Sequence, residues 1–554
     1  MLVKEKLYAL DDVTIIPAVI SKVKSRKQCN PFYKIDDKDY FPIFVSPMEC
    51  TINKKNFNIY DKNHIIPILP RTESYKDRVD YAINSKWAAF SLAEFEELFT
   101  QDKRTYKTSV KEVADNAEIG LCNGIHIRAL IDNANGHMIK VSEAITKAKE
   151  QAAKNGYTIE IMAGNIANPK TYRELALAGA DYIRCSIGTG NNCFVAGTKV
   201  ALKDNNFKNI EDIQVGDYVL THMHQYKKVT KVFSSEYTKN LINIKLYGRQ
   251  ENMESVTCTL NHPFYVYRNG EYQWVEAENL NLETDWVANL SFVRRPVALT
   301  INGELLEKRI GDYICTKIKE LSTIRNQECT VYNIEVEDDH SYTANGCFVH
   351  NCTTASNTAT YMPLASLIDE CRKIKNMYGL KAAIIADGGI SEYKNVIKAL
   401  ALGADYVMIG SRFTRCFESA SEFDSISKPE KEYTYYTLSM LNNLRYSDKL
   451  SEQEKKTIIK TYSPKKRSWG MSTRRAQISI SLAKGYEINE IQTKTSEGVE
   501  KIVDVDYTLA QWIENMNDFL RSNMSYCNAF TLHEYIGTPK VMLISDNAKN
   551  AVNK

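Results

Sequence analysis

The stretch Cys193-Phe-Val-Ala-Gly-Thr-Lys-Val200 begins with a cysteine, and Val349-His350-Asn351 stands immediately before a second cysteine, Cys352. A cysteine at the first position and a His-Asn-Cys at the last are what a self-excising segment needs. If residues 193–351 are taken out, the flanks join as Ser186-Ile-Gly-Thr-Gly-Asn-Asn192 followed by Cys352-Thr-Thr354. That joined text is a glycine loop that presents a cysteine. The sequence therefore predicts an enzyme interrupted by an insert at its nucleophile.

The excision chemistry can be derived from residue types. Cys193 would attack the carbonyl of Asn192 to give a thioester, and Cys352 would then take over the acyl group. Asn351 would cyclise through its side-chain amide and cut the bond to Cys352. Because an amide is a poor electrophile, each step needs a positioned proton donor or a polarised carbonyl. The candidates for this role within the insert are Thr259, His262, His340 and His350.

The insert resembles the inteins, the Hint-fold protein-splicing elements, over its whole length. Four stretches carry the resemblance: Cys193–Val200, Thr257–Pro263 with its Thr-x-x-His pair, Val331–Gly346 and Val349–Asn351. The resemblance implies an all-β mini-intein, since no LAGLIDADG-type endonuclease motif lies between His262 and Val331. Asn333 departs from the aspartate of many inteins. Two alternatives are an ordinary cysteine-rich β insertion and a Hint domain that cleaves without ligating, and Cys352 favours ligation.

Composition restricts the class of protein. The 554 residues are 44% hydrophobic and 25% charged, with a formal net charge of +3. This balance gives no reason to expect nucleic acid or a membrane as the main partner. The first residues lack the apolar core of a signal peptide, and no apolar run is long enough to span a bilayer. The 13 cysteines show no CxxC pair, so thiols are expected rather than a disulfide framework, and a cytoplasmic location.

Short apolar runs alternate with helix-like segments in the flanks, such as 138–155 and 169–178. Eight strands alternating with helices predict a (β/α)8 TIM barrel, with a doubly wound open sheet as the alternative. The expected domains are 1–192 (barrel strands one to six), 193–351 (the insert) and 352–554, with a flap subdomain within 413–500. The eight predicted strands are 42–45, 65–69, 88–91, 127–131, 159–162, 182–185, 383–386 and 406–409.

Marked residues follow the strands of the predicted barrel, where the chemistry of such barrels is located. Glycine at a strand end lets backbone amides approach a phosphate, and the loops after strands seven and eight commonly hold one. Such residues follow strand one and the five consecutive strands four to eight. They are Ser46-Pro-Met48, Asp132-Asn-Ala-Asn-Gly136, Ala163-Gly-Asn165, Gly188-Thr-Gly190 with the joined Cys352, Asp387-Gly388-Gly389 and Gly410-Ser411.

The joined flanks resemble the family of IMP dehydrogenase and GMP reductase. The resemblance is carried by the cysteine loop 187–192 with 352–354, Ala386–Gly389, Met408–Ser411, Trp469–Ser472, Ser496–Gly498 and the C-terminal helix 520–526. It implies that Cys352 attacks C2 of a purine while a nicotinamide cofactor exchanges a hydride at that carbon. A covalent thioimidate makes hydride transfer at this weak electrophile feasible.

The same resemblance implies roles for individual residues. Cys352 would be the nucleophile, and Thr354 and Glu497 would move protons. Asp132 and Asn165 would face the nicotinamide ribose of NADPH or NAD. It further implies a purine mononucleotide (GMP or IMP) as ligand, a monovalent cation such as K⁺ and a homotetramer after splicing, whereas no residues show metal-ligand spacing. The substrate-binding residues would be Ser46, Met48, Gly190, Asp387, Gly388, Gly389, Gly410, Ser411, Gly470, Met471 and Ser472.

The direction of the reaction is less well defined. Asn133–Gly136, Ile161–Asn165 and Gly470–Ser472 resemble the reductase, and residues 472–496 contain no Arg-Tyr pair of the dehydrogenase type. We therefore favour GMP reductase, with IMP dehydrogenase as the alternative. Asn191, Ala355 and Ser468 depart from the family pattern. They leave open a catalytically degenerate barrel in which self-splicing is the only chemistry.

Overall fold

The computed structural model describes residues 7–100, 124–186, 193–350, 362–427, 436–493 and 500–544, apart from short gaps within these ranges. The gaps are 204–205, 238–239, 249–252, 254, 261, 291–297, 302–303, 326–328, 338, 340, 391, 448 and 472. The chain divides into two compact units, which are described separately. The barrel unit comes mainly from 1–188, 360–498 and 502–545, and the insert unit mainly from 189–359.

Eight parallel strands form the barrel. Their order around the sheet is β4 (Ile43–Val45), β27 (Tyr406–Ile409), β26 (Ala383–Asp387), β9 (Tyr182–Cys185), β8 (Thr158–Ile166), β7 (His126–Ile131), β6 (Trp87–Phe90) and β5 (Ile68–Leu69). The ring closes because the Val45 amide donates to the Ile66 carbonyl (2.9 Å) and the Ile66 amide to the Ile43 carbonyl (3.0 Å). All eight predicted strands are confirmed, and the barrel, not the open sheet, is the fold.

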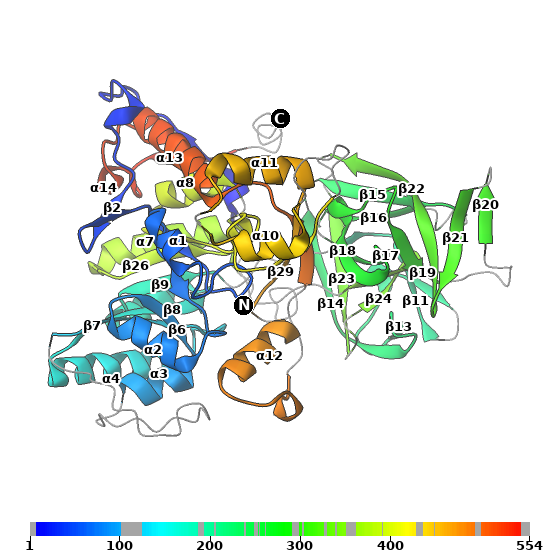
Figure 1. The fold of residues 1–554 in the computed structure, drawn as a ribbon, viewed down its shortest axis with the longest axis horizontal. Helices are drawn as coiled ribbons and strands as arrows, with labels where there is room; N and C mark the ends of the chain where they lie inside the picture. The colour runs from blue at the N-terminus through cyan, green and yellow to red at the C-terminus, as the bar shows by residue number, and fades with distance from the viewer. Residues whose placement is uncertain are drawn as a thin grey trace. The chain divides into compact units, whose positions relative to one another are not determined.

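Helices cover the outside of this barrel (Figure 1). The predicted helices 138–155 and 169–178 are α4 (Ile139–Asn155) and α5 (Pro169–Leu177). Both have local causes: α4 ends at Gly156, whose φ of 76° suits a left-handed cap, and α5 begins at Pro169 behind Asn168, whose side chain caps Lys170 N–H. The other covering helices are α1 (Phe57–Lys62), α2 (Tyr75–Ile83), α3 (Leu92–Phe99), α7 (Leu364–Tyr378), α8 (Tyr393–Leu402) and α13 (Leu509–Tyr526).

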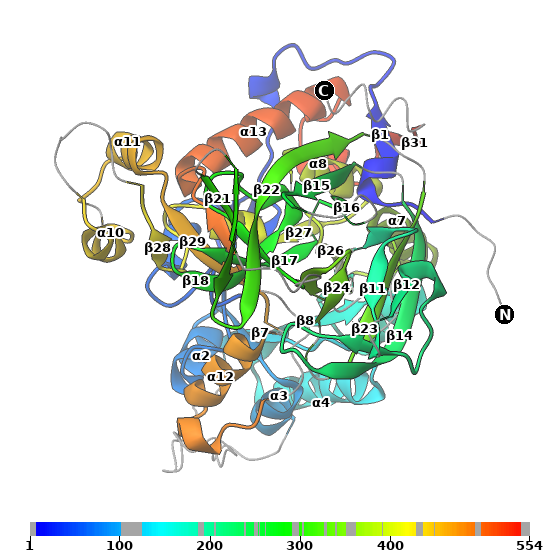
Figure 2. The same cartoon turned by 90° about the vertical axis from the view of Figure 1, so that its right-hand side faces the viewer.

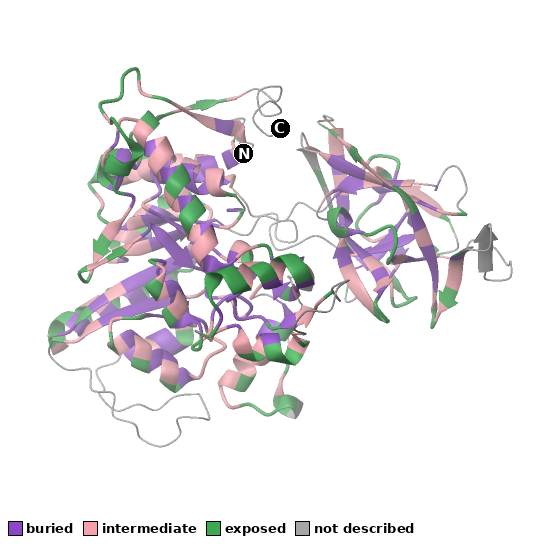
Figure 3. Ribbon diagram, turned by 45° about the horizontal axis from the view of Figure 1, so that its top comes forward, coloured by how far each residue is buried: buried purple, intermediate pink, exposed green. Residues whose placement is uncertain are grey.

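Alternation along each strand divides the barrel core into two clusters. Phe44 belongs to the cluster inside the barrel, whereas its neighbours Ile43 and Val45 belong to the cluster beneath the helices. Figure 3 shows most of the length of the barrel strands as buried. The carboxyl ends of the strands are therefore the part of each strand that can reach a ligand.

The region after β27 forms the flap. It contains α9 (Ser411–Thr414), β28 (Phe423–Ser425), α10 (Leu438–Leu444), α11 (Glu452–Tyr462), β29 (Lys465–Trp469), α12 (Arg474–Ala483) and β30 (Glu500–Asp504). Phe417, Phe423, Leu441, Ile458 and Tyr462 belong to a small core of its own. Strands β28, β29 and β30 form one sheet.

Segments near the two ends of the chain pair with each other (Figure 2). Strand β1 (Val13–Ile16) lies antiparallel to β31 (Lys540–Leu543), with Val13 opposite Leu543. The hairpin β2 (Tyr33–Ile35) and β3 (Lys38–Tyr40) and the short helix α14 (Leu532–Tyr535) complete the barrel unit.

The insert is all-β in its described residues apart from single turns of 3-10 helix, and its strand pairs are antiparallel. Its hairpins have sequence causes: Asn269-Gly270 joins β17 to β18 and Asn345-Gly346 joins β24 to β25, all at positive φ. The strands are β10 (Phe194–Val195), β11 (Lys199–Ala201), β12 (Phe207–Asn209), β13 (Tyr218–Leu220), β14 (Tyr226–Tyr237), β15 (Leu241–Leu246), β16 (Ser255–Thr259), β17 (Pro263–Arg268), β18 (Glu271–Glu276), β19 (Trp286–Asn289), β20 (Ala298–Ile301), β21 (Glu304–Ile310), β22 (Tyr313–Ile324), β23 (Cys329–Val336), β24 (Ser341–Ala344) and β25 (Cys347–His350). The predicted all-β insert is confirmed.

Candidate functional site

Four polar side chains meet at the carboxyl ends of β7, β8, β9 and β26. Arg184 donates from Nε to Asp387 Oδ2 (3.0 Å) and from Nη1 to Asp132 Oδ1 (2.9 Å). Asn165 Nδ2 donates to the same Asp387 Oδ2 (2.8 Å). Asp132, Asn165 and Asp387 are residues that the sequence singles out, and the structure brings them into one hydrogen-bonded network through Arg184.

Arg184 is the residue that sequence reasoning missed. Burial by itself lowers its pKa, but the charges of Asp387 and Asp132, together with the hydrogen bonds to them, raise that pKa above the ordinary value. The signal was present in Tyr182-Ile-Arg-Cys185, because a charged residue in a buried strand requires a charged partner. Arg184 therefore holds two carboxylates close together at a site that is largely shielded from solvent.

Asp387 and Asn165 each keep one acceptor atom that has no hydrogen-bond partner among the described residues. Both arginine contacts and the Asn165 contact of Asp387 go to Oδ2, which leaves Oδ1. Asn165 uses Nδ2 for Asp387 and for the Ser186 carbonyl (2.8 Å), which leaves its own Oδ1. These atoms can accept hydrogen bonds from a hydroxyl-rich ligand.

A close backbone contact fixes Asn165. The Gly136 amide donates to the Asn165 carbonyl (2.9 Å), and the Asn165 amide donates to the Asn133 carbonyl (2.8 Å). A Cβ on Gly136 would lie 2.8 Å from the Asn165 carbonyl oxygen, so only glycine fits there. These backbone hydrogen bonds thus fix the loop after β7 against the end of β8.

A second group of the predicted residues meets beside β4 and β27. The Ser46 amide donates to the Ile409 carbonyl (2.9 Å), and a Cβ on Gly410 would lie 2.5 Å from Met48 Sδ. Met48 and Met471 both pack on the cluster of Cys50, Trp469 and Ala476. The structure thus brings Ser46, Met48, Gly410 and the Gly470-Met471 stretch together.

The predicted phosphate-binding residues occupy the first turns after β26 and β27. Gly388 and Gly389 have φ of 85° and 71°, a conformation that favours glycine. Ser411 is exposed and is the first residue of α9.

Several predicted site residues lie outside the described residues: Gly190, His340, Asn351, Cys352, Thr354, Ser472 and Glu497.

In the insert, both backbone groups of Cys193, the amide and the carbonyl, form hydrogen bonds with Thr259. The Cys193 amide donates to Thr259 Oγ1 (3.0 Å), and the Thr259 amide donates to the Cys193 carbonyl (2.9 Å). Cys193 itself is 6% exposed. The Thr259 hydroxyl is therefore within reach of the nitrogen of the bond at which Cys193 would act.

His262 lies next to both ends of the insert. Its ring centroid is 4.0 Å from that of Phe194, the residue after Cys193. Burial lowers the pKa of His262 well below its ordinary value, the charge of His350 lowers that pKa further, and contact with the His350 backbone opposes this. The register Phe264 opposite Val349 agrees with this placement. The ring is consequently a neutral imidazole that the two ends share.

Asn333 has a fixed orientation. The amide of Ile334 and the hydroxyl of Tyr342 both donate to Asn333 Oδ1, each at 2.7 Å. Since a backbone N–H can only donate, the oxygen must face these groups, and the Nδ2 amide of the buried Asn333 faces elsewhere. Asparagine thus contributes N–H donors where many inteins have a carboxyl group.

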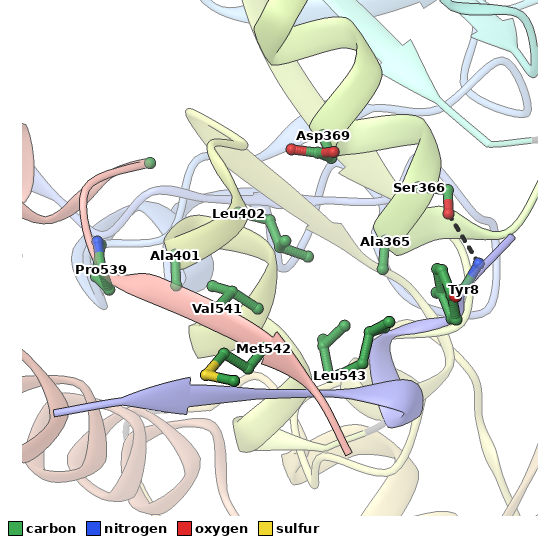
Figure 4. A pocket seen from close by; sticks show the side chains of 12 residues that line it. Tyr8, Ala365, Ser366, Asp369, Ala401, Leu402, Pro539, Val541, Met542 and Leu543 are labelled. Atoms are coloured by element: carbon green, nitrogen blue, oxygen red, sulfur yellow. Dashed lines mark hydrogen bonds between the residues drawn. The ribbon is translucent and has the colours of Figure 1, made fainter. Parts of the chain in front are cut away.

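A pocket of about 360 Å³ lies beside the β1–β31 ribbon (Figure 4). Its lining includes Tyr8, Ser366, Asp369 and Met542, and the Tyr8 amide donates to Ser366 Oγ (2.8 Å). None of the residues that the sequence singled out lines it, so it is not the candidate site.

Within the described ranges, no group of three or more His, Cys, Asp or Glu residues could hold a metal ion, and none of the helices found there is long and apolar enough to cross a membrane.

Together, the fold and these sites define a (β/α)8 barrel with a polar cluster at its strand ends, interrupted by an all-β insert whose ends meet at one histidine. A model of the IMP dehydrogenase / GMP reductase domain matches residues 112–201 and 350–448, and a model of the intein splicing domain matches 198–351. The chain therefore contains an IMP dehydrogenase / GMP reductase domain that is split by an intein splicing domain.

Curated relatives agree with this assignment. A GMP reductase of Oceanobacillus iheyensis is 26% identical over 34% of this chain and 53% of its own length. A GMP reductase of Clostridium acetobutylicum is 27% identical over the same shares. An inosine-5′-monophosphate dehydrogenase of Helicobacter pylori is 43% identical over 13% of this chain and 15% of its own length. The chain spans about half the length of these two reductases.

Proposed function

We propose that the chain is a precursor that excises residues 193–351, joins 1–192 to 352–554 and so forms an NAD(P)-dependent purine nucleotide oxidoreductase, with GMP to IMP as its reaction. The observation that carries the splicing half is the junction geometry of Cys193, Thr259 and His262. The polar cluster of Asp387, Arg184 and Asn165 supports the oxidoreductase half.

For splicing, the residues can supply the proton that the first step needs. When Cys193 Sγ attacks the Asn192 carbonyl, the Cys193 nitrogen leaves and must gain a proton. Thr259 Oγ1 lies 3.0 Å from that nitrogen. The buried His262, whose pKa is lowered by burial, has its ring centroid 4.0 Å from that of Phe194, the residue after Cys193. A neutral imidazole can accept and return a proton without a change in net charge over the cycle. Its contact with His350 lets the same ring serve Asn351.

For the oxidoreductase, the barrel supplies positions for the parts of a nucleotide. Asp387 Oδ1 would accept the ribose hydroxyls, and the backbone at Gly389 and Gly410 would hold the phosphate together with Ser411. Cys352 would add to C2 of the purine, with Thr354 and Glu497 moving the protons.

The residues present also fit a nicotinamide cofactor. Asp132 keeps Oδ2 available, with only a 3.8 Å contact to Arg71, and Asn165 keeps Oδ1. Asp132 and Asn165 would accept hydrogen bonds from the nicotinamide ribose side and orient it at C2. NADPH or NAD supplies or accepts the hydride when bound. A monovalent cation such as K⁺ and a homotetramer after splicing belong to the same proposal.

The reductase direction has two supports. Asn133–Gly136, Ile161–Asn165 and Gly470–Ser472 resemble the reductase, and the relatives that match the chain over the longer stretches are named GMP reductases. The short, closer match to an IMP dehydrogenase keeps the opposite direction as the second candidate.

One preparation tests both halves. The full chain is expressed in reducing buffer, its intact mass is measured, and cofactor absorbance is then followed with GMP and with IMP. We expect a ligated enzyme and a free insert, followed by oxidation of NADPH with GMP. Cys193→Ala is the matched control: it lacks the thiol that forms the thioester, so no ligated enzyme should appear. A wild-type chain that stays whole contradicts splicing, whereas a ligated chain inactive with both nucleotides would leave a degenerate barrel.

A further inference from the structure

Ser186 follows β9 directly and lies beside Asp387. Asn165 Nδ2 donates both to the Ser186 carbonyl and to Asp387 Oδ2, each at 2.8 Å, so one nitrogen bridges the two residues. A Cβ on Gly388, the residue after Asp387, would lie 3.3 Å from Ser186 Oγ. The Ser186 hydroxyl therefore belongs to the polar cluster at the barrel mouth.

That hydroxyl has no hydrogen-bond partner within the part of the chain that the structure describes. Ser186 is 0% exposed, and its Oγ is a buried polar atom without a partner. Buried hydroxyls almost always have one, because an unsatisfied group loses its bonds to water without replacement. A ligand hydroxyl placed at this position would remove that cost.

The backbone of Ser186 adds a second observation. Its φ is 137°, a region that residues with a Cβ rarely adopt and that glycine occupies freely. A serine at this position strains the backbone, and such strain is typical of residues held for binding or catalysis. The position thus keeps a hydroxyl where a glycine would be easier to accommodate.

Ser186 Oγ and Asp387 Oδ1 together suit two adjacent hydroxyl groups. The carboxylate oxygen can only accept, whereas the serine hydroxyl can donate or accept, so the pair can bind both hydroxyls of a vicinal diol. Asp387 Oδ1 is itself without a partner among the described residues. Neither atom has to break an existing bond to take part.

We infer that Ser186 is a specificity-determining residue that binds one ribose hydroxyl while Asp387 binds the diol through Oδ1, so that the site selects ribonucleotides over deoxyribonucleotides. This inference rests on the proposed function, because it takes the ligand to be a purine nucleotide. The role of Ser186 is to recognise the sugar, and it takes no part in the chemistry at C2.

The test compares Ser186→Ala with Ser186→Gly and wild type. Ser186→Ala removes the hydroxyl and keeps the strained Cβ, whereas Ser186→Gly removes both. Isothermal titration calorimetry measures GMP, 2′-deoxy-GMP and 3′-deoxy-GMP on the same form of each protein, established by intact mass. Thermal unfolding without ligand shows whether each variant folds.

We expect wild type to bind GMP more tightly than at least one deoxy analogue, and both variants to bind GMP about 3- to 10-fold more weakly. The variants should bind the analogue that lacks the recognised hydroxyl as wild type does. Without ligand, neither variant should unfold at a lower temperature, since no existing bond is lost. Ser186→Gly should unfold at a higher temperature than Ser186→Ala.

Two failures can be told apart. A wild-type protein that binds neither GMP nor IMP would refute the proposed function, and the role of Ser186 with it. A wild-type protein that binds GMP, with a GMP to deoxy-GMP ratio that Ser186→Ala leaves unchanged, would refute the role of Ser186 alone. A lower unfolding temperature for both variants would instead identify a structural hydrogen bond to Ser186 Oγ and overturn the inference.

Discussion

Replacing Arg184 with methionine tests whether the polar cluster at the barrel mouth is held together by charge. The side chains of Arg184, Asp132 and Asp387 are 8%, 14% and 12% exposed. Removing the guanidinium leaves two carboxylates facing each other with little water. Breaking a buried ion pair in this way costs about 3–5 kcal/mol, whereas an exposed pair contributes about 0–1 kcal/mol. We expect Arg184→Met to lower the unfolding free energy of the barrel by the larger amount.

The control is Lys373→Met on α7. Lys373 pairs with Asp369 and Glu370 but is 57% exposed, so its loss should cost less than about 1 kcal/mol. The double change Arg184→Met with Asp387→Asn removes one of the stranded charges and should recover part of the loss.

The assay is hydrogen exchange in peptides that cover β9 and β26, followed through urea unfolding. This local readout is needed because a chain of two units does not unfold in a single transition. Equal costs for Arg184→Met and Lys373→Met would refute the reasoning, because they would show that the two carboxylates do not depend on the arginine.

Three further predictions follow from the geometry. Burial holds the pKa of His262 below the value of about 6.5 that the unfolded chain has, so the unfolded chain binds an extra proton below that pH. The unfolding free energy of the insert should fall by up to about 1.4 kcal/mol for each unit by which the pH is lowered below about 6.5, as measured by acid titration. His262→Gln should flatten that slope. Tyr342→Phe removes the hydrogen bond to Asn333 and should cost about 1 kcal/mol, while hydroxylamine should release more N-terminal flank relative to ligated product. Gly136→Ala places a Cβ against the Asn165 carbonyl and should cost about 1–3 kcal/mol in thermal unfolding, with weaker cofactor binding; a neutral result would mean that the loop yields.

The barrel could be predicted from the sequence because its strands are buried on both faces. Runs such as Ala383-Ile-Ile-Ala386 and Tyr406-Val-Met-Ile409 lie between helices, and a parallel strand covered on both sides appears as a continuous apolar run. The candidate residues at the strand ends followed from the same register, since the residue after each run lies at the carboxyl edge.

Other features depend on contacts that carry no local signal. The pairing of β1 with β31 joins Val13 to Leu543 across the whole chain, and nothing near either residue indicates it. Arg184 could have been noticed as a charge in an apolar strand, but its two partners come from β7 and β26 and need the closed barrel to be identified. Ser186 is an ordinary serine in the sequence, and only its φ and its buried hydroxyl distinguish it.

The barrel is already formed on both sides of the insert. Tyr182 lies opposite Ala383 and Cys185 opposite Ala386, so β9 and β26 pair directly although 159 residues expected to be excised separate Asn192 from Cys352. Cys185 and Cys371, from opposite flanks, have their sulfurs 3.9 Å apart in the shared core. Excision is therefore not needed to build the fold or to bring Asp387 to Arg184. What it would change is the connection between β9 and α7, which we propose to carry the nucleophile, so splicing would act on the chemistry and not on the fold.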